Sequence, residues 1–202
     1  MARLRLYQAP VLTYYEWRRR AMASVRNIGS GCLDWQRYPQ KTFPWSDHAM
    51  RFTWVLRKAS LSRAPFWRFV LRRMRERYGL EIPRGTKIGP GLYLGHAFNI
   101  TVNESAVIGS NCNLHKGVTI GQENRGRRKG APILGNCVWV GVNATIVGGI
   151  RVGDDVLIAP GAYVNCDVPS HSVVLGNPCR VIPRDHATDG YINRKVHQMQ
   201  SD

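Results

Sequence analysis

Aliphatic residues recur at every sixth position through the C-terminal half of this 202-residue chain. They form two runs: Val102, Ile108, Leu114 and Ile120, then Leu134, Val140, Ile146, Val152, Ile158 and Val164. Four positions after most of them stands a second small or apolar residue: Ala106, Cys112, Val118, Val138, Ala144, Ile150, Val156 and Ala162. An amphipathic helix repeats near 3.6 residues and a half-buried strand every 2, so neither produces this period. A hexapeptide period is typical of a parallel β-helix.

The pattern therefore predicts a mainly β fold in which each hexapeptide contributes one short strand and one turn. We expect the recurring aliphatic to point into a triangular prism and the second small residue to lie near a corner, where space is tight. Three hexapeptides close one coil, and strands of successive coils pair. A two-layer sandwich of short strands is the alternative, but it does not require two matched sets of positions at a constant period.

Two interruptions of the period mark segments that leave the coil. Leu94 and Val102 are eight positions apart instead of six, which predicts a bulge at 96–99. A second interval, from Ile120 to Leu134, is fourteen positions long and predicts an extended loop at 122–131. Irregular segments on a rigid scaffold are where functional side chains concentrate.

The chain divides into a basic, helical region at 1–79, the coils at 80–183 and a polar tail at 184–202. The tail is expected to be flexible. Helices are predicted at 12–25, 47–59 and 65–78, with a loop at 29–44. Asp47 is a suitable N-cap for the second helix, Pro65 suits the first turn of the third, and Gly79 ends it.

Positive charge is concentrated before the coils. The chain has 29 Lys and Arg against 13 Asp and Glu, a formal net charge of +16. Residues 1–79 hold 17 of the basic residues and four of the acidic ones. The coils and tail are nearly balanced, so any attraction to an anionic partner belongs to the N-terminal region.

Composition points to a cytoplasmic protein. No stretch approaches the roughly 18 apolar residues that a membrane span needs. Arg3, Arg5 and Glu16 interrupt the apolar core that a signal peptide would have. The five cysteines are odd in number and show no paired spacing, so we expect small hydrophobes in a reducing compartment rather than disulfides or zinc ligands.

His96 lies in the predicted bulge and is the first candidate for chemistry. Its unperturbed pKa near 6.5 lets an imidazole accept a proton at neutral pH, so a histidine held on a rigid coil suits a general base. The alternative is a surface histidine without a role. Spacing alone does not decide between the two.

Three segments resemble the serine acetyltransferase-like branch of the hexapeptide acyltransferases. They are residues 91–103 (GLYLGHAFNITVN), 117–121 (GVTIG) and 176–182 (GNPCRVI). The resemblance covers about half of the chain and includes both interruptions. It implies a left-handed β-helix, a homotrimer, and acetyl-CoA bound in the groove between two subunits as the donor for O-acetyl transfer. No metal is implied.

The resemblance also implies roles for individual residues. His96 matches the family's general base. Glu81, fifteen positions earlier, occupies the place of the acidic residue that orients it, with glutamate instead of the usual aspartate. Gly141 and Ala159 match positions where coil backbones flank the pantetheine arm. Arg180 is a candidate partner for the CoA phosphates.

Departures from the family pattern concern the acceptor. Serine acetyltransferases carry an aspartate before the catalytic histidine, where this chain has Gly95, and an Arg-His-Pro in the long loop, where residues 130–132 read GAP. Arg128 and Lys129 are candidates to replace the missing ligands, with a solvated charge run as the alternative. His115, at the outward position after Leu114, is a further candidate for the acceptor groove, with a strand-surface histidine as the alternative. A sugar hydroxyl is therefore the preferred acceptor, and serine is the alternative.

The short, basic N-terminal region is closer in character to relatives in capsule, exopolysaccharide or lipid-linked glycan synthesis. Arginines and aromatic rings at 64–78 suit peripheral contact with an anionic membrane, where a lipid-linked acceptor would be found. The alternative is that these rings pack against the β-helix or a neighbouring subunit. Both can hold together.

Two other classes of function remain open. A zinc enzyme of the γ-carbonic anhydrase type shares this fold but needs three histidines at a subunit interface. His96 and His115 are available, but Ile120 stands where the third is expected. A non-catalytic nucleic-acid binder would use the basic N-terminal region, yet no recognition motif is present.

Overall fold

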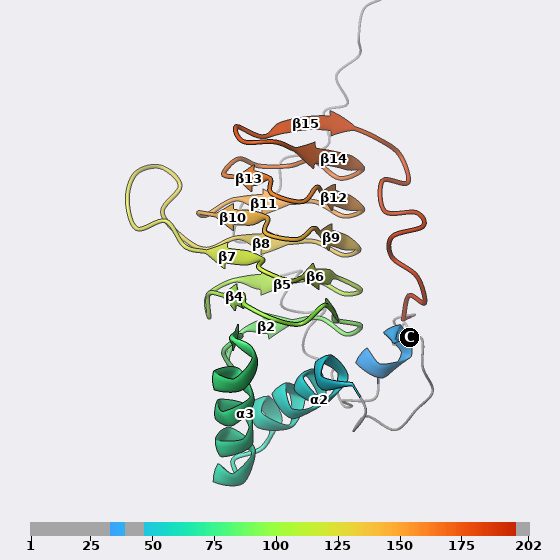
Figure 1. Ribbon diagram of the computed structural model, residues 1–202. Coiled ribbons are helices and arrows are strands. Elements are labelled where there is room, and N and C mark those ends of the chain that lie inside the picture. Colours follow the sequence, from blue (N-terminus) through green and yellow to red (C-terminus); the bar gives the residue numbers. More distant parts are fainter. Residues whose placement is uncertain (1–32, 39–46, 197–202) are drawn as a thin grey trace, which may run out of the picture.

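The computed structural model describes residues 33–38 and 47–196. Its strands form three sheets that wind into a triangular prism (Figure 1). Sheet A comprises β1 (Leu80–Glu81), β4 (Ile100–Val102), β7 (Thr119–Gly121), β10 (Thr145–Val147) and β13 (Tyr163–Val164). Sheet B comprises β2 (Lys87–Ile88), β5 (Val107–Ile108), β8 (Ile133–Leu134) and β11 (Arg151–Val152). Sheet C comprises β3 (Tyr93–Gly95), β6 (Asn113–His115), β9 (Val138–Val140), β12 (Val156–Ile158), β14 (Ser172–Leu175) and β15 (Arg180–Pro183).

Strand register measures the length of each coil. Val102 pairs in parallel with Ile120, 18 residues further on, which is three hexapeptides. The first coil needs 20 residues, since Leu80 pairs with Ile100. The coil that contains the long loop needs 26, because Val107 pairs with Ile133. Both interruptions thus lie where the sequence predicts them.

The core fills the prism axis as the hexapeptide pattern predicts. Every one of the ten recurring aliphatics is buried, and so is every residue of the second set. The fold is a left-handed parallel β-helix with few helices, so the predicted fold class is confirmed. The backbone N–H and C=O groups of each strand form hydrogen bonds with the coils above and below, so the strands need no helices on their outer face.

Two helices cover the open end of the first coil (Figure 1). Helix α2 (His48–Leu61) starts where the Asp47 carboxylate accepts hydrogen bonds from two backbone N–H groups. Helix α3 (Pro65–Tyr78) has proline in its first turn and ends at Gly79, whose φ of 64° is the left-handed cap conformation. Both predicted helices are confirmed. The helix predicted at 12–25 lies outside the described residues.

A short 3₁₀ helix, η1 (Asp34–Arg37), replaces part of the loop predicted at 29–44. It is anchored by the buried ion pair between Asp34 and Arg57 of α2, with Nε 2.8 Å from Oδ2. The same carboxylate accepts from the backbone N–H groups of Gly91 and Leu92. This anchor depends on contacts between segments that are distant in the sequence, so no local sequence pattern predicts it.

The C-terminal end departs from the prediction in two ways. Strand β15 pairs with β14 antiparallel, so the last part of the predicted coil region turns back as a hairpin. The chain then runs down beside sheet C toward η1 (Figure 1). This segment, 185–196, is held to the prism through Asp155, which accepts from Thr188, and through Asn111, which bonds Val196. The expectation of a flexible tail is wrong for these residues, since polar side chains on the coils satisfy its backbone.

Four cysteines lie in the described residues, all with free thiols. Cys112 is buried in the core and Cys137 lies at a corner, as predicted. Cys166 and Cys179, which show no paired spacing in the sequence, lie with their sulfurs 3.7 Å apart. No helix in the described ranges is long and apolar enough to cross a membrane.

Candidate active site

The bulge at 96–99 forms the corner between sheets C and A in the first coil. His96 follows directly after β3 and has a φ of 50°, and Asn99 has a φ of 54°. These two left-handed residues turn the chain sharply, so the imidazole of His96 is exposed while the neighbouring Ala97 is buried. An exposed histidine on a rigid corner is placed to meet a substrate.

Glu81 lies on β1, at the same end of the β-helix as His96. Its neighbours Leu80 and Ile82 are fully buried, so strand alternation directs the Glu81 side chain outward. Its Cα is in register with Thr101 of β4, the strand that follows the His96 corner. Among the described contacts, no hydrogen bond or ion pair joins Glu81 to His96. The orienting role of Glu81 therefore remains a prediction.

His115 of β6 lies one coil from the His96 corner and in register with Gly95. Its Nδ1 donates to the Val140 carbonyl oxygen at 2.9 Å, which leaves Nε2 free to accept a hydrogen bond. Burial lowers the pKa of His115 and outweighs the hydrogen bond to the Val140 carbonyl oxygen, which acts to raise it, while the neighbouring His96 ring adds to the lowering. At neutral pH His115 is thus an uncharged acceptor beside the candidate base.

Gly95 is the reason that His115 fits. A Cβ at position 95 would lie 2.6 Å from His115 Nε2, so the imidazole occupies the space that a side chain here would need. The aspartate that precedes the catalytic histidine in serine acetyltransferases has no room in this arrangement. The sequence departure at Gly95 therefore leaves the space that the His115 imidazole occupies.

Sequence reasoning missed His48, the first residue of α2. Its Nε2 lies 3.1 Å from the Ala97 carbonyl oxygen in the bulge. Its ring stacks on Phe98 and Tyr78, with centroids 4.7 and 4.8 Å away. Helices α2 and α3 thus brace the His96 corner, and no spacing along the chain signals a contact that joins two separate elements.

The predicted acceptor cations lie in the long loop, which projects from the prism (Figure 1). Glu123 and Gly130 pair across its base, with both N–H···O distances at 2.9 Å. Arg128 and Lys129 are exposed. The guanidinium of Arg128 donates to the Asn165 carbonyl oxygen just after β13, so its position is set two coils further along rather than by His96. Neither cation contacts the His96 corner in this chain.

The predicted donor residues lie near the other end. Gly141 and Ala159 occupy equivalent corners of adjacent coils, after β9 and β12. A Cβ on Gly141 would lie 2.6 Å from the Pro160 nitrogen, so glycine is required by the close approach of two coils. Arg180 is exposed on β15. The structure does not bring these residues together with His96.

No group of three or more potential metal ligands occurs among residues 33–38 and 47–196. His96 and His115 are neighbours, but the third histidine that a γ-carbonic anhydrase site requires is not part of this cluster. The zinc alternative therefore has no donor set in the described part of the chain.

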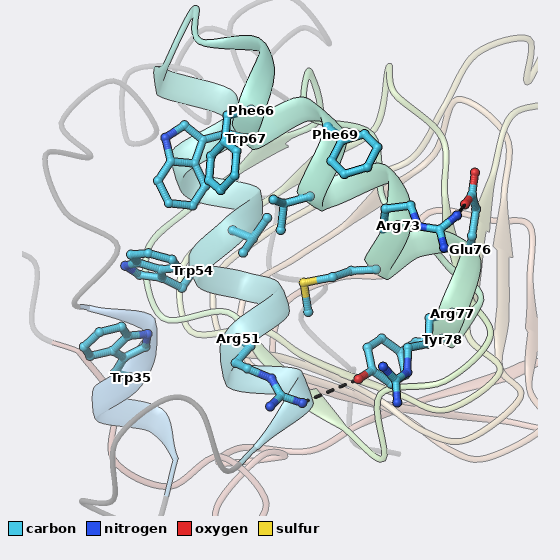
Figure 2. Close-up of a pocket in the computed structure, with 13 residues that line it drawn as sticks. Trp35, Arg51, Trp54, Phe66, Trp67, Phe69, Arg73, Glu76, Arg77 and Tyr78 are labelled. Carbon is cyan, nitrogen blue, oxygen red and sulfur yellow. Dashed lines mark hydrogen bonds and ion pairs between the residues drawn. The ribbon is translucent and has the colours of Figure 1, made fainter.

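A second feature is an apolar groove between α2 and α3 (Figure 2). Trp67 packs edge-on against Trp54, with centroids 5.1 Å apart, so this ring belongs to the helix–helix contact. Phe66 and Phe69 are 61% and 63% exposed, so they do not pack against the prism. Of the two alternatives for the rings of residues 64–78, packing within the chain applies to Trp67, whereas Phe66 and Phe69 are exposed and could contact a membrane surface or a partner.

The three-sheet prism, the hexapeptide spacing and the histidine corner define a left-handed parallel β-helix of the hexapeptide-repeat class. Within this class the chain is similar to serine acetyltransferases. The enzyme of Synechococcus elongatus is 39% identical over 106 residues, which is 52% of this chain and 43% of the relative. The enzyme of Helicobacter pylori is 39% identical over 107 residues, or 53% of this chain and 63% of the relative.

Solved structures show the same similarity over a longer span. The serine acetyltransferase of Neisseria gonorrhoeae is 29% identical with a TM-score of 0.64, covering 85% of this chain and 74% of that one. Its complex with serine matches at 27% identity with a TM-score of 0.61, covering 84% of this chain and 69% of that one. No family model matches the chain. The chain spans about half the length of the curated relatives it matches.

These comparisons test the family resemblance that the sequence motifs suggested. They support the serine acetyltransferase-like resemblance, and the ones described here are named for serine rather than for a polysaccharide acceptor. The matched segment is as long as the β-helical coils, but it covers only part of each curated relative.

Proposed function

We propose that this chain is an acetyl-CoA-dependent O-acetyltransferase with His96 as the general base. The observation that carries the proposal is the exposed His96 corner on the first coil, in a β-helix similar to serine acetyltransferases. A hydroxyl is a poor nucleophile until a base removes its proton, and such a base contributes about 10²–10⁴-fold to the rate.

The proposed reaction has two proton transfers, from the acceptor hydroxyl to His96 and from His96 to the CoA sulfur. His96 takes the proton of the acceptor hydroxyl as its oxygen attacks the thioester carbonyl carbon. The tetrahedral intermediate collapses with cleavage of the C–S bond, and the imidazolium returns the proton to the CoA sulfur. Glu81 is proposed to orient the imidazole and to stabilise its charged form, as carboxylates do in hydrolase triads. Neutral His115 is proposed to accept a hydrogen bond from the bound acceptor.

Serine is the acceptor to which the relatives' names point, and it is the first to test. The Neisseria gonorrhoeae enzyme has been solved with serine bound. If serine is the acceptor here, its carboxylate and ammonium must find ligands other than those of the family pattern. Arg128 and Lys129 remain candidates only if loops of neighbouring subunits meet the His96 corner.

A sugar hydroxyl is the second candidate, favoured by a specific observation. His115 fills the space beside Gly95, and Ala131 of the long loop is buried, so neither position offers a ligand for an amino acid. A sugar offers hydroxyls and needs no ammonium ligand at these positions. The named relatives do not support this acceptor.

Donor binding and assembly are proposed from the family resemblance. Gly141 and Ala159 would flank the pantetheine arm, and Arg180 would meet a CoA phosphate. The groove for acetyl-CoA would form between two subunits of a homotrimer. Analytical ultracentrifugation of the full chain measures the mass of this assembly. We propose a cytoplasmic location. Peripheral contact of residues 64–78 with an anionic membrane stays a prediction, supported by the exposure of Phe66 and Phe69.

Thiol release from acetyl-CoA, measured with and without L-serine, tests the proposal. The wild-type chain is compared with His96→Ala and with His186→Ala, which removes an exposed histidine from the C-terminal segment. We expect acceptor-dependent release that falls about 10²–10⁴-fold in His96→Ala and is unchanged in His186→Ala.

Absence of thiol release with serine would require other acceptors to be tested. If serine gives no release, the assay is repeated with nucleotide sugars and lipid-linked glycans as acceptors. A folded His96→Ala chain that keeps full turnover with any of these acceptors would refute His96 as the base.

A further inference from the structure

A cavity of about 460 Å³ lies on the outer side of sheet C, beside the His96 corner. Four separate segments line it: Arg37 of η1, Tyr93 of β3, Asn113 and His115 of β6, and Arg194 of the C-terminal segment. Its volume falls in the range of small-molecule sites. Neither the predicted donor residues nor the loop cations belong to it.

Arg37 is buried in this cavity without enough partners. The residue is 5% exposed. One nitrogen, Nη2, donates to the Asn113 side-chain oxygen, but Nε and Nη1 are buried and have no hydrogen-bond partner among residues 33–38 and 47–196. A guanidinium carries five N–H donors, and a buried donor left unpaired costs free energy. Three of the Arg37 N–H groups, one on Nε and two on Nη1, therefore lack an acceptor among the described residues, and both nitrogens are shielded from solvent.

Arg57 shows what a purely structural buried arginine looks like in the same region. Its Nε and Nη2 donate to Asp34, and its Nη1 and Nη2 donate to the carbonyl oxygens of Ile88 and Gly89 at 2.6 Å. Every nitrogen of this guanidinium has a partner, and a carboxylate balances its charge. Arg37, on the same 3₁₀ segment as Asp34, has neither.

The charge of Arg37 is also unbalanced. Three of the titratable groups that act on it are Cys112, Cys137 and Tyr38, and burial raises the pKa of each, so these three are neutral near pH 7. Arg194 adds a second positive charge, and no carboxylate is among the described residues that line the cavity. Burial lowers the pKa of Arg37, although a guanidinium stays charged in proteins. A buried cation is ordinarily paired, so the missing partner is an anion.

We propose that this cavity binds a small oxyanion, a carboxylate or a phosphate, with the incompletely paired guanidinium of Arg37 as its counter-charge. Guanidinium groups match these anions because their N–H donors lie in one plane and can bind two oxygens together. Arg194 would add charge at the rim, and the neutral His115 would add a hydrogen-bond acceptor for a hydroxyl of the same molecule.

The position of the cavity connects the anion to acetyl transfer, and this step rests on the proposed function. His115 lines the cavity, and its ring lies against Gly95, the residue before His96. An acceptor whose anionic group binds Arg37 would carry its hydroxyl toward the candidate base. The cavity offers no carboxylate for an ammonium, so a hydroxy acid fits it at least as well as serine. A CoA phosphate is the other source of the same chemistry.

Calorimetric titration of the full chain tests binding without turnover. The probes are 3-hydroxypropionate, L-serine, inorganic phosphate and 3′,5′-ADP, titrated into wild type, Arg37→Met and Arg68→Met. We expect an oxyanion to bind wild type and Arg68→Met alike, and about tenfold or more weaker in Arg37→Met. Arg68 is an exposed arginine of α3 and controls for the loss of one charge.

The probes separate the two sources. Arg37-dependent binding of 3-hydroxypropionate or serine identifies the acceptor carboxylate, and Arg37-dependent binding of 3′,5′-ADP alone identifies a CoA phosphate. If Arg37→Met does not fold, Arg37→Lys and the rim variant Arg194→Met replace it, with weaker binding expected in both. Equal affinity in the folded variants, or no binding of any probe, overturns the proposal. Thiol release is scored separately, so turnover without oxyanion binding refutes the site alone, and binding without turnover refutes the proposed function alone.

Discussion

The Gly95–His115 contact shows how one pair of residues determines which groups an acceptor site can present. His115 is fixed by its hydrogen bond to the Val140 carbonyl oxygen and by ring contact with Trp139, whose centroid is 4.6 Å away. Because its imidazole covers position 95, that position must be glycine. The site therefore presents a neutral imidazole where the family pattern has a carboxylate.

Introducing a carboxylate at position 95 should be destabilising unless His115 is shortened. Gly95→Asp forces the imidazole out of its place, and we expect a loss of about 1–3 kcal/mol in the free energy of unfolding. In the combined variant Gly95→Asp/His115→Ala the clash is absent, so the two changes should be non-additive by about 1 kcal/mol. Denaturant unfolding of the three variants and wild type measures this. Additive losses would contradict the contact.

At the scale of elements, the N-terminal segments are attached to the β-helix by polar contacts as well as by apolar ones. Asp34 of η1 and Arg57 of α2 form a buried ion pair, and Arg57 also reaches two carbonyl oxygens of the first coil. This network joins η1, α2 and the strand β2 at one point. It also places Arg37 in its cavity, because η1 has only one turn.

Removing the Arg57 guanidinium should uncouple these elements. Arg57→Met leaves the Asp34 carboxylate buried and unpaired, and we expect a loss of about 3–5 kcal/mol in the free energy of unfolding. Arg68→Met, on the exposed face of α3, should change it by less than about 0.5 kcal/mol. Urea unfolding of both variants checks the difference. An Arg57→Met chain as stable as Arg68→Met would show that the ion pair does not hold η1.

At the scale of the whole molecule, the C-terminal segment connects the last coil back to the first ones. It leaves β15, passes Asp155 and then packs Tyr191 on Trp139, with centroids 5.1 Å apart. It ends against Asn111 and Asn113, which bond the backbone of Val196 and Tyr191. The oxyanion cavity exists only because this segment closes one side of it.

Docking of the segment should weaken in acid. Burial acts to raise the pKa of Asp155, but hydrogen bonds from Thr188, His171 and Ala187 outweigh it and lower the pKa below the ordinary value of 3.8. A carboxylate with a lowered folded-state pKa stabilises the docked form in full above pH 3.8, and this contribution is lost as the pH falls through the folded value. The hydrogen-exchange protection factors of residues 187–196, which correct for the intrinsic pH dependence of exchange, should therefore fall below about pH 4.

Asp155→Asn should reproduce that effect at neutral pH. We expect docking to weaken by about 1–3 kcal/mol, seen as faster exchange in the same residues. Asp189→Asn is the matched control, because the Asp189 carboxylate is exposed and lies 3.6 Å from the exposed His186 ring. Equal protection in Asp155→Asn and wild type would mean that apolar contacts alone hold the segment.

The sequence by itself determined the prism. A period of six places each aliphatic on the axis, so burial, coil length and both interruptions can be read from spacing, and the caps of α2 and α3 from single residues. His96 could be singled out because an interruption is also a local signal. These features depend on neighbours along the chain, which is the information that a single sequence carries most directly.

Only the tertiary structure decided what surrounds His96. Arg37, Asn113 and Arg194 are far apart in the chain, and they line one cavity because η1 and the C-terminal segment both fold against sheet C. The same holds for His48, which reaches the His96 corner from α2. Contacts of this kind follow from packing between elements, and no period or motif encodes them. Their physical cause is the need to pair buried charges and backbone groups across segments, and at Arg37 that pairing is still incomplete within the part of the chain that the structure describes.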